Sequence, residues 1–411
     1  MSWKKVTLDD IASNIQTGPF GSQLHQSDYS EEGTPVVMPK DLVSGHISEA
    51  SIARVSEDHV NRLSRHKIEV GDILYSRRGD VGRCAFATDL EQGWLCGTGC
   101  LRVTIDKSKA VPKFVFYQLQ KAETVGWVEK HAVGATMLNL NTSILSSVPI
   151  DIPSIEEQRV IVDMLSAYDD LIGNNQQQIK LLEEAAQRLY KEWFVDLRFP
   201  GHETTSITDG IPADWMQVCL DDVISKITTG LNPRKNFTLG VGKNYYVTIK
   251  NMANNSIYLN DKCDKVDDEA IEKINKRSDL QRGDILFSGI GTIGRVYMID
   301  IPTKNWNVSE SVFTMRANDM ISKEYLYLLL LSHDMQSYCD QNAHGVAQRG
   351  IRMADLRAYK FALPPKTMID SFTSFVKPLI EKTQYLRQQI ALLEETRDRL
   401  LPKLMNGEIE V

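Results

Sequence analysis

Apolar residues recur with a heptad rhythm in two long stretches of the chain. In the first stretch only Asn175 interrupts the series, whose apolar or small members are Ile161, Leu165, Tyr168, Ile172, Ile179, Leu182, Ala186, Leu189 and Trp193. The second series follows 211 residues later and comprises Phe372, Val376, Leu379, Thr383, Leu386, Ile390, Leu393, Arg397, Leu400 and Leu404. Alternating steps of four and three residues are typical of a helix whose seam faces another helix. We therefore predict two long helices, at residues 155–197 and 367–405, that pair with each other.

Four residues complicate this pairing. A lone Asn175 in the seam would fix the register at some cost in stability. Gly173 lies in the first helix, and Pro378 and Pro402 lie in the second. Because Pro inside a helix kinks or ends it, we expect a bent or locally interrupted pair. The alternative is that each apolar stripe packs on its own neighbouring domain, as most amphipathic helices do.

The sequence contains two copies of one long segment. Residues 6–18 return at 218–230, and residues 70–76, which contain Gly-Asp-Ile-Leu, return at 282–288. A repeat of about half the chain is a tandem duplication rather than a short-period solenoid. Each copy reads as a mixed segment of short strands and turns followed by one long helix. Capping-box spacing marks the start of each helix, with Ser154 before Glu157 and Thr367 before Asp370.

The two copies differ in their loops. Residues 19–27 have no close match in residues 231–239, and residues 135–141 diverge from residues 346–352. Positions of the scaffold repeat while surface loops do not. This pattern is expected when two copies of one fold must bind two different things.

The chain shows no catalytic motif of its own. Gly289-Ile-Gly-Thr-Ile-Gly294 matches a dinucleotide fingerprint by letter, but the residues after it read as a second strand rather than a helix. We interpret this run as a glycine-bearing connection between two strands. The six cysteines form no Cys-x-x-Cys pair and no zinc spacing, so we predict no metal site. Carboxylate pairs such as Asp9-Asp10 could serve in acid–base catalysis, but we interpret them as favourable negative charge at a helix N-terminus.

Bulk properties narrow the class further. The length of 411 residues allows two or three domains with real cores. No apolar run approaches the roughly 18 residues that cross a bilayer, and we expect a soluble, cytoplasmic protein. The net charge of −7 does not indicate a nucleic-acid-binding protein, although a protein that is acidic overall can still carry a basic face.

Basic and amide side chains nevertheless gather in both mixed segments. Arg matches guanine edges and phosphates, while Asn and Gln match adenine. Any one of these residues is more commonly a solvated surface charge, but the set gains weight from its place on divergent loops. The residues that we expect at DNA are Ser22, Gln23, Lys40, Arg54, Arg65, Arg77, Arg78, Asn139, Arg234, Lys235, Lys250, Gln348, Arg349 and Arg352.

These features resemble the specificity (S) subunits of type I restriction-modification systems. The resemblance covers the whole chain, and its most specific parts are residues 152–158, 189–201 and 400–408 together with Gly-Asp-Ile-Leu in both halves. The second run before a helix, residues 363–369, departs from the family because it lacks the Glu-Glu-Gln of the first.

The resemblance implies an α+β fold in which a mixed α/β target-recognition domain is duplicated in tandem. Each copy would be followed by a long helix, and the two helices would form an antiparallel coiled coil. The implied boundaries are residues 1–153 and 201–365 for the recognition domains, and 154–200 and 366–411 for the helices.

The resemblance also implies a non-catalytic subunit whose two domains read the halves of a gapped site in double-stranded DNA. Two modification (M) subunits would supply S-adenosylmethionine and adenine methylation, and restriction (R) subunits would supply ATP- and Mg-dependent cleavage. No cofactor is expected in this chain. Two other readings stay open: a coiled-coil adaptor whose globular ends bind proteins, and an enzyme in its own right.

Overall fold

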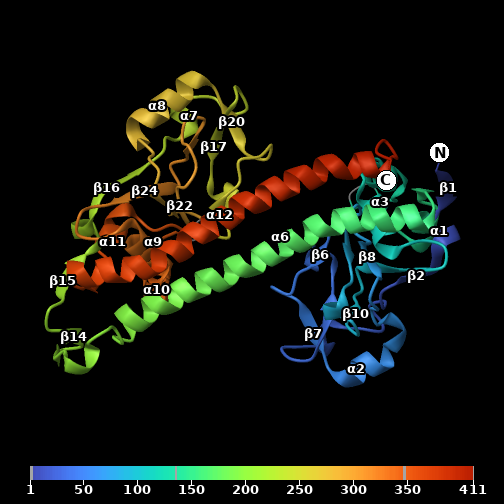
Figure 1. The fold of residues 1–411 in the computed structure, drawn as a ribbon, viewed down its shortest axis with the longest axis horizontal. Coiled ribbons are helices and arrows are strands. Elements are labelled where there is room, and N and C mark those ends of the chain that lie inside the picture. Colours follow the sequence, from blue (N-terminus) through green and yellow to red (C-terminus); the bar gives the residue numbers. More distant parts are fainter. Residues whose placement is uncertain (1–2, 135–136, 346–348, 411) are drawn as a thin grey trace. The chain divides into compact units, whose positions relative to one another are not determined.

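The structure is a computed structural model that describes residues 3–134, 137–345 and 349–410. It contains two compact units (Figure 1). Unit 1 comprises residues 1–173 and 390–411, and unit 2 comprises residues 174–389. The long helices α6 (Ile155–Tyr190) and α12 (Lys366–Met405) each contribute to both units. Each unit therefore combines one mixed domain with part of both helices.

Unit 1 is built around an antiparallel sheet. Its order is β2–β11–β8–β9, with β2 (Ala12–Thr17), β11 (Cys100–Ile105), β8 (Ile73–Ser76) and β9 (Cys84–Phe86). A second sheet has the order β10–β4–β7–β3, with β10 (Leu95–Cys96), β4 (Thr34–Val37), β7 (Ala53–Val55) and β3 (Tyr29–Ser30). The short pairs are β1 (Lys4–Thr7) with β12 (Pro149–Ile152) and β5 (Leu42–Val43) with β6 (His46–Ile47). The smaller helices are α1 (Leu8–Ile11), α2 (Glu57–Arg62), α3 (Pro112–Gln120), α4 (Ala122–His131) and α5 (Thr142–Ser146).

Unit 2 repeats this plan. Its main sheet has the order β16–β24–β21–β22, with β16 (Ile224–Thr229), β24 (Val312–Ala317), β21 (Ile285–Ser288) and β22 (Val296–Met298). The second sheet comprises β20 (Asp264–Val266), β17 (Asn244–Val247) and β23 (Trp306–Val308). The short pairs are β13 (Ile207–Thr208) with β14 (Ile211–Pro212), β15 (Met216–Cys219) with β25 (Lys360–Leu363), and β18 (Met252–Ala253) with β19 (Ser256–Ile257). The smaller helices are α7 (Pro233–Asn236), α8 (Asp268–Ser278), α9 (Lys323–Leu331), α10 (His333–Gln341) and α11 (Met353–Arg357). The matching strand orders confirm the predicted duplication of an α+β domain.

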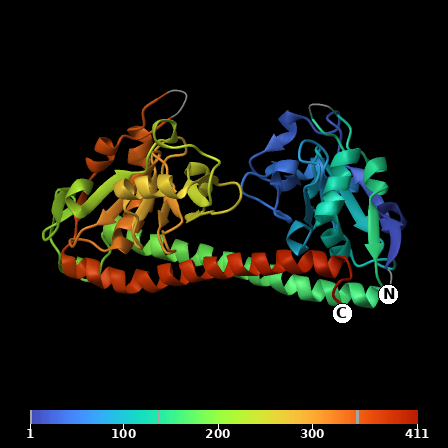
Figure 2. The same cartoon turned by 90° about the horizontal axis from the view of Figure 1, so that it is seen from above.

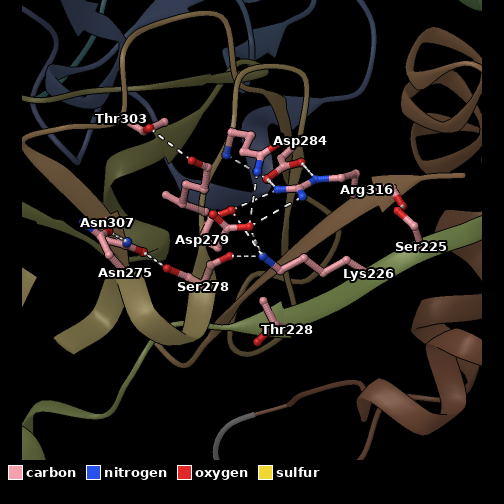
Figure 3. Close-up of polar contacts among 12 residues, drawn as sticks. Ser225, Lys226, Thr228, Asn275, Ser278, Asp279, Asp284, Thr303, Asn307 and Arg316 are labelled. Atoms are coloured by element: carbon pink, nitrogen blue, oxygen red, sulfur yellow. Dashed lines mark hydrogen bonds and ion pairs between the residues drawn. The ribbon is translucent and has the colours of Figure 1, made fainter. Parts of the chain in front are cut away.

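The repeated Gly-Asp-Ile-Leu run is a structural element in both units. Gly283 takes φ +93°, a left-handed conformation that favours glycine, and it turns the chain into β21. The buried Asp284 carboxylate accepts a hydrogen bond from the backbone N–H of Gln281 at 2.9 Å and another from Arg316 Nε at 2.7 Å (Figure 3). The hydrogen bond to Asp284 raises the pKa of the Arg316 guanidinium. The motif thus fixes the start of strand β21, and its Asp284 carboxylate is already paired with Arg316.

Unit 1 uses the same turn with one different partner. Gly71 takes φ +96°, and the buried Asp72 accepts from the Glu69 amide at 2.8 Å. Thr104 donates to Asp72 from the place that Arg316 occupies in unit 2, 212 residues away. Burial raises the pKa of Asp72 against the opposing effect of these hydrogen bonds. Strand entrances are therefore conserved in both copies, whereas their supporting side chains differ.

In unit 2 the two long helices pair in antiparallel fashion through an aromatic cluster (Figure 2). A π-helical turn, Lys191–Val195, follows α6 and directs two consecutive aromatic residues inward. The Phe372 ring on α12 lies 5.6 Å from the Trp193 ring and 4.7 Å from the Phe194 ring, between centroids. Nearer the unit boundary, Arg387 on α12 pairs with Glu183 on α6. Buried rings and a paired charge together set the register of this segment.

In unit 1 the same helices pair through their other ends. Ile161 and Leu165 on α6 share a core cluster with Leu404 and Met405 on α12. Arg397 Nη1 donates to the Asp169 carboxylate at 3.0 Å, and the Tyr117 hydroxyl of α3 also donates to this carboxylate. The ion pair therefore fixes both helices to the mixed domain of unit 1.

The end of the chain closes onto unit 1. The buried Gln118 side chain donates to the Asp151 carbonyl at 3.0 Å and to the Met405 carbonyl at 3.1 Å. Lys121 donates to the Asn406 side chain. The last turns of α12 are consequently part of the core of the N-terminal domain.

The predicted seam residues lie in the interior or at its margin. Buried members are Ile161, Leu165, Ile172, Val376 and Leu386. Half-buried members are Tyr168, Asn175, Ile179, Leu182, Leu189, Leu379, Ile390, Leu393 and Leu400. Antiparallel pairing in each unit agrees with the predicted coiled coil.

Of the expected bend or local interruption, the interruption was wrong. Both α6 and α12 continue without a break through Gly173, Pro378 and Pro402. These three residues are exposed, while Val376 and Ile380 on either side of Pro378 are buried in the core of unit 2. Tertiary packing of the flanking turns outweighs the local cost of proline. The ends differ slightly too, because α6 passes into its π-turn after residue 190 and α12 begins at Lys366, one residue before the predicted start.

Replacing Phe372 by Ala should lower the free energy of unfolding of unit 2 by about 3–5 kcal/mol, because a fully buried ring is lost from the seam. Urea titration followed by tryptophan fluorescence measures this change. Tyr385→Ala is the matched control, since its side chain lies on the same helix in unit 2 but is 52% exposed. We expect the control to lose less than about 1 kcal/mol. Equal losses in the two variants would contradict the assignment of the seam.

Candidate nucleic-acid interface

A glycine-bearing hairpin loop projects from the main sheet of each unit. In unit 1, residues 77–83 connect the antiparallel strands β8 and β9. In unit 2, residues 289–295 connect β21 and β22 in the same way. Gly79 takes φ +77° and Gly291 takes φ +81°. The strand after residue 295 confirms that the Gly-x-Gly-x-x-Gly run is a hairpin connection, since a dinucleotide fingerprint would open a helix there.

In unit 1 a second divergent loop lies directly against this hairpin. The Leu140 amide donates to the Arg77 carbonyl at 2.8 Å, and the Gly79 amide donates to the Leu138 carbonyl at 3.1 Å. Asn139 exchanges backbone hydrogen bonds with Val133, which closes the second loop on itself. Two segments that diverge in the sequence therefore form one continuous edge.

Unit 2 repeats this backbone arrangement. The Ile351 amide donates to the Gly289 carbonyl at 2.8 Å, and the Gly291 amide donates to the Arg349 carbonyl at 2.7 Å. Gly350 exchanges backbone hydrogen bonds with His344. We call the hairpin loop and the described part of its neighbour in each unit the loop pair, comprising residues 77–83 with 133–134 and 137–141 in unit 1 and residues 289–295 with 344–345 and 349–352 in unit 2.

The two loop pairs carry basic side chains at different positions of the same backbone arrangement. In unit 1 the hairpin loop supplies the cations Arg77 and Arg78, and the second loop supplies Asn139. In unit 2 the equivalent hairpin positions are Gly289 and Ile290, and the second loop supplies the exposed Arg349 and Arg352. One scaffold thus presents two different sets of donors.

A pair of lysines occupies equivalent turns in the two units. Lys40 lies in a 3-10 turn, Pro39–Asp41, and Lys250 lies in the matching turn, Ile249–Asn251. The third residue of each turn, Asp41 or Asn251, accepts a hydrogen bond at 2.9 Å from the backbone amide that precedes the turn. Both lysines are exposed. Lys40 Nζ also donates to Ser51 Oγ at 2.9 Å and lies 3.4 Å from the Asp41 carboxylate.

In unit 2 the lysine turn adjoins the loop pair. Arg295, in the hairpin loop, donates through Nη1 to the Ile249 carbonyl at 2.7 Å. The sequence drew attention to Lys250 but not to this connection, because the role of Arg295 depends on a contact 46 residues away in the chain.

Other predicted residues are engaged elsewhere. Arg54 donates to the Gly33 carbonyl at 2.9 Å and pairs with Glu49 at 3.3 Å. Arg65 Nε donates to His66 Nε2 at 3.0 Å. Burial, together with the nearby Arg65 and Arg102, lowers the pKa of His66 to about 4, so His66 is a neutral acceptor at pH 7.

The remaining predicted residues divide into three groups. Ser22 is exposed, and Gln23 accepts from the Phe20 amide at 3.1 Å in the same turn. Arg234 and Lys235 lie exposed on α7. Gln348 lies outside the described residues. Among the described residues, no side-chain hydrogen bond or ion pair joins Arg54, Arg65, Arg234 or Lys235 to the loop pairs.

The structure adds one residue that sequence reasoning missed. Phe20 is 52% exposed, and its ring lies 5.7 Å from the Arg77 guanidinium carbon. Val133 and Met137, on the second loop of unit 1, are also more than 60% exposed. The only sequence signal for Phe20 is that an apolar residue lies in a divergent loop. Its exposure to solvent cannot be predicted from one sequence.

The described part of the chain contains neither a cluster of metal ligands nor a helix that could span a membrane. No group of three or more potential metal ligands occurs among residues 3–134, 137–345 and 349–410. No described helix is both long enough and apolar enough to span a membrane.

Comparisons with known proteins agree on one class. The model of the type I restriction modification DNA specificity domain matches residues 1–184 and again residues 212–395. The MjaIX type I restriction enzyme specificity subunit of Methanocaldococcus jannaschii is 27% identical over 92% of this chain and 87% of its own length. The HindI specificity subunit of Haemophilus influenzae is 24% identical over 99% of both chains. The crystal structure of the type I S subunit from M. genitalium has a TM-score of 0.59 at 17% identity, and the match covers 98% of this chain and 96% of that one.

Proposed function

The chain belongs to the type I restriction-modification DNA specificity family and is a specificity subunit with two recognition domains in tandem, and on this premise we propose that each unit reads one half of a gapped, two-part DNA site. The loop pair of unit 1 reads the first half-site, and the loop pair of unit 2 reads the second. The two halves of the target differ in sequence.

One observation carries this proposal. Both loop pairs use the same backbone hydrogen bonds, yet Arg77 and Arg78 at the start of the hairpin loop of unit 1 are replaced by Gly289 and Ile290 in unit 2, whose exposed arginines, Arg349 and Arg352, lie on the second loop. A common frame would let both units approach DNA in the same way. Exchanged side chains would then favour different base edges, because each base pair offers its own donors and acceptors in the major groove.

The equivalent lysines are proposed to bind the part of DNA that both half-sites share. Lys40 and Lys250 keep the same residue type at the same turn, although the surrounding loops diverge. Phosphates are the same in every DNA sequence. A residue that contacts a phosphate can therefore stay the same in both copies of the domain. Their loss should weaken binding without changing the preferred sequence.

The chemistry of the reaction is assigned to partner subunits. We propose that two M subunits carry S-adenosylmethionine and methylate adenine, and that R subunits use ATP and Mg for translocation and cleavage. This chain contributes sequence recognition and a docking surface. The proposal is supported by the family of the chain and by the placement of its described side-chain clusters in structural roles.

In unit 2 the docking surface is proposed to be a groove beside α6. Its volume is about 710 Å³, and its lining is mostly apolar surface of α6 and α9, with the charged residues Glu184, Arg188, Lys191 and Asp334 also present. Leu181 on its rim is 57% exposed. On the part of α6 in unit 1, Val160, Met164 and Leu171 are also exposed. Apolar side chains left open along a helix that already has a partner favour a second protein rather than DNA.

Mapping of N6-methyladenine across the genome of a host tests the reading role. A host that carries this chain and its M partner should show one gapped, two-part methylated motif, and deletion of this chain alone should abolish it. Arg78→Ala should relax the sequence of one half only, since Arg78 lies on the loop pair of unit 1. An unchanged methylome on deletion, with the M partner expressed, would favour the adaptor reading instead.

Leu181→Arg tests the docking surface. A charge in the apolar groove should weaken co-purification of the M partner at least tenfold, because the guanidinium would lose its hydration on docking. Leu90→Arg is the control, since Leu90 is 75% exposed on the globular part of unit 1. Wild-type partner binding by Leu181→Arg, in a protein that unfolds like the wild type, would place the docking surface elsewhere.

A further inference from the structure

Phe20 is held out from unit 1 by a firmly anchored turn. Gly18 before it is buried against Gly97, and a Cβ on Gly18 would lie 1.9 Å from the Gly97 oxygen. The Gln23 amide donates to the Phe20 carbonyl at 2.8 Å, and Leu24 after the turn is 4% exposed in a core cluster. The exposure of the Phe20 ring therefore follows from a fixed backbone rather than from a loose loop.

The neighbouring arginine is equally fixed at its backbone. The Arg77 amide donates to the Gly99 carbonyl at 2.9 Å, and the Arg77 carbonyl accepts from the Leu140 amide at 2.8 Å. Its guanidinium lies over the Phe20 ring, within the range of a cation–π contact. An arginine anchored at its backbone and lying beside an aromatic ring has fewer orientations open to its guanidinium.

The Arg77 side chain has no acceptor in the part of the chain that the structure describes. Within the described residues its guanidinium makes no hydrogen bond or ion pair, and its Nε atom is buried. Arg83 in the same loop differs, because it pairs with the Asp80 carboxylate at 2.7 Å. A guanidinium that lies beside a ring and has no acceptor among the described residues keeps its two Nη groups available for an external one, whereas the buried Nε is not accessible.

Two DNA acceptors fit this pair of Nη groups, namely a phosphate and the O6/N7 edge of guanine. The arrangement favours guanine for two reasons. A restrained guanidinium matters for bidentate contact with a flat base edge, and it matters less for a phosphate that presents oxygens in several directions. The pair also occurs in one unit only, whereas phosphates are common to both half-sites.

Unit 2 cannot form the same pair. Gly289 takes the place of Arg77, and a Cβ there would lie 2.6 Å from the Phe313 ring. Asn232 takes the place of Phe20 in the sequence, and its side chain is committed to Glu310 at 2.8 Å and to the Arg234 amide at 2.9 Å. Any effect of the pair should therefore be confined to one half-site.

From these contacts we infer that Arg77 reads a guanine in the half-site of unit 1, and that Phe20 is the positioning residue that holds the guanidinium plane for this contact. The inference rests on the proposed function. It adds the identity of one base and the side chain that sets the geometry of its recognition.

The test compares Phe20→Leu, Phe20→Tyr and Arg77→Lys in the full chain assembled with its M partner. The preference at every position of the two-part motif is measured by methylation of a randomised DNA library. Wild type should require a G·C pair in the half-site of unit 1. Phe20→Leu and Arg77→Lys should each lower discrimination at that pair roughly tenfold or more, with the other half-site unchanged. Phe20→Tyr keeps an aromatic face and should retain wild-type discrimination.

Leu90→Ala is the control for loss of an exposed apolar side chain in unit 1 and should leave every position unchanged. The inference is overturned if the half-site of unit 1 contains no G·C pair. It is also overturned if Phe20→Leu leaves discrimination intact, or lowers methylation equally at all positions as a folding defect would. A wild-type complex without any two-part motif would overturn the proposed function itself, whereas an intact motif with an inert Phe20 removes only this inference.

Discussion

Both units depend on the antiparallel pairing of α6 and α12. Neither core is complete without the two helices, because α6 and α12 supply buried residues to the main clusters of unit 1 and unit 2 alike. Aromatic stacking around Phe372 fixes the pair in unit 2, and the Arg397–Asp169 ion pair fixes it in unit 1. Partly buried charge pairs of this kind constrain register even where their net contribution to stability is small. The seam is therefore a requirement for both recognition domains.

The duplicated domain separates constant from variable positions. The turn before β8 and β21 uses a left-handed glycine and a buried aspartate in both units, and it secures the strands from which the hairpin loops project. Backbone hydrogen bonds then join each hairpin loop to a second loop in the same register. Since none of these contacts involves the exposed side chains, those side chains can change without loss of the frame. A specificity subunit needs this independence to acquire new targets.

Much of this architecture could be predicted from one sequence. The duplication, the paired helices and the hairpin around Gly289–Gly294 all depend on periodicity and short-range signals, which a sequence displays directly. The continuity of α12 through Pro378 could not be predicted, because it depends on the burial of Val376 and Ile380 in unit 2. Phe20 was missed for a related reason. Its exposure and its contact with Arg77, 57 residues away, result from tertiary structure, and Gln348 lies outside the described residues altogether.

The central claim is that two readers built on one frame act independently. A chimaera tests it most directly, with residues 1–150 replaced by the equivalent segment of a family relative whose methylated motif is known. The methylome of a host carrying the chimaera and the M partner should show a hybrid motif, with one half taken from the relative and the other half unchanged. Alteration of both halves, by a chimaera that still assembles with its partner, would contradict independent reading.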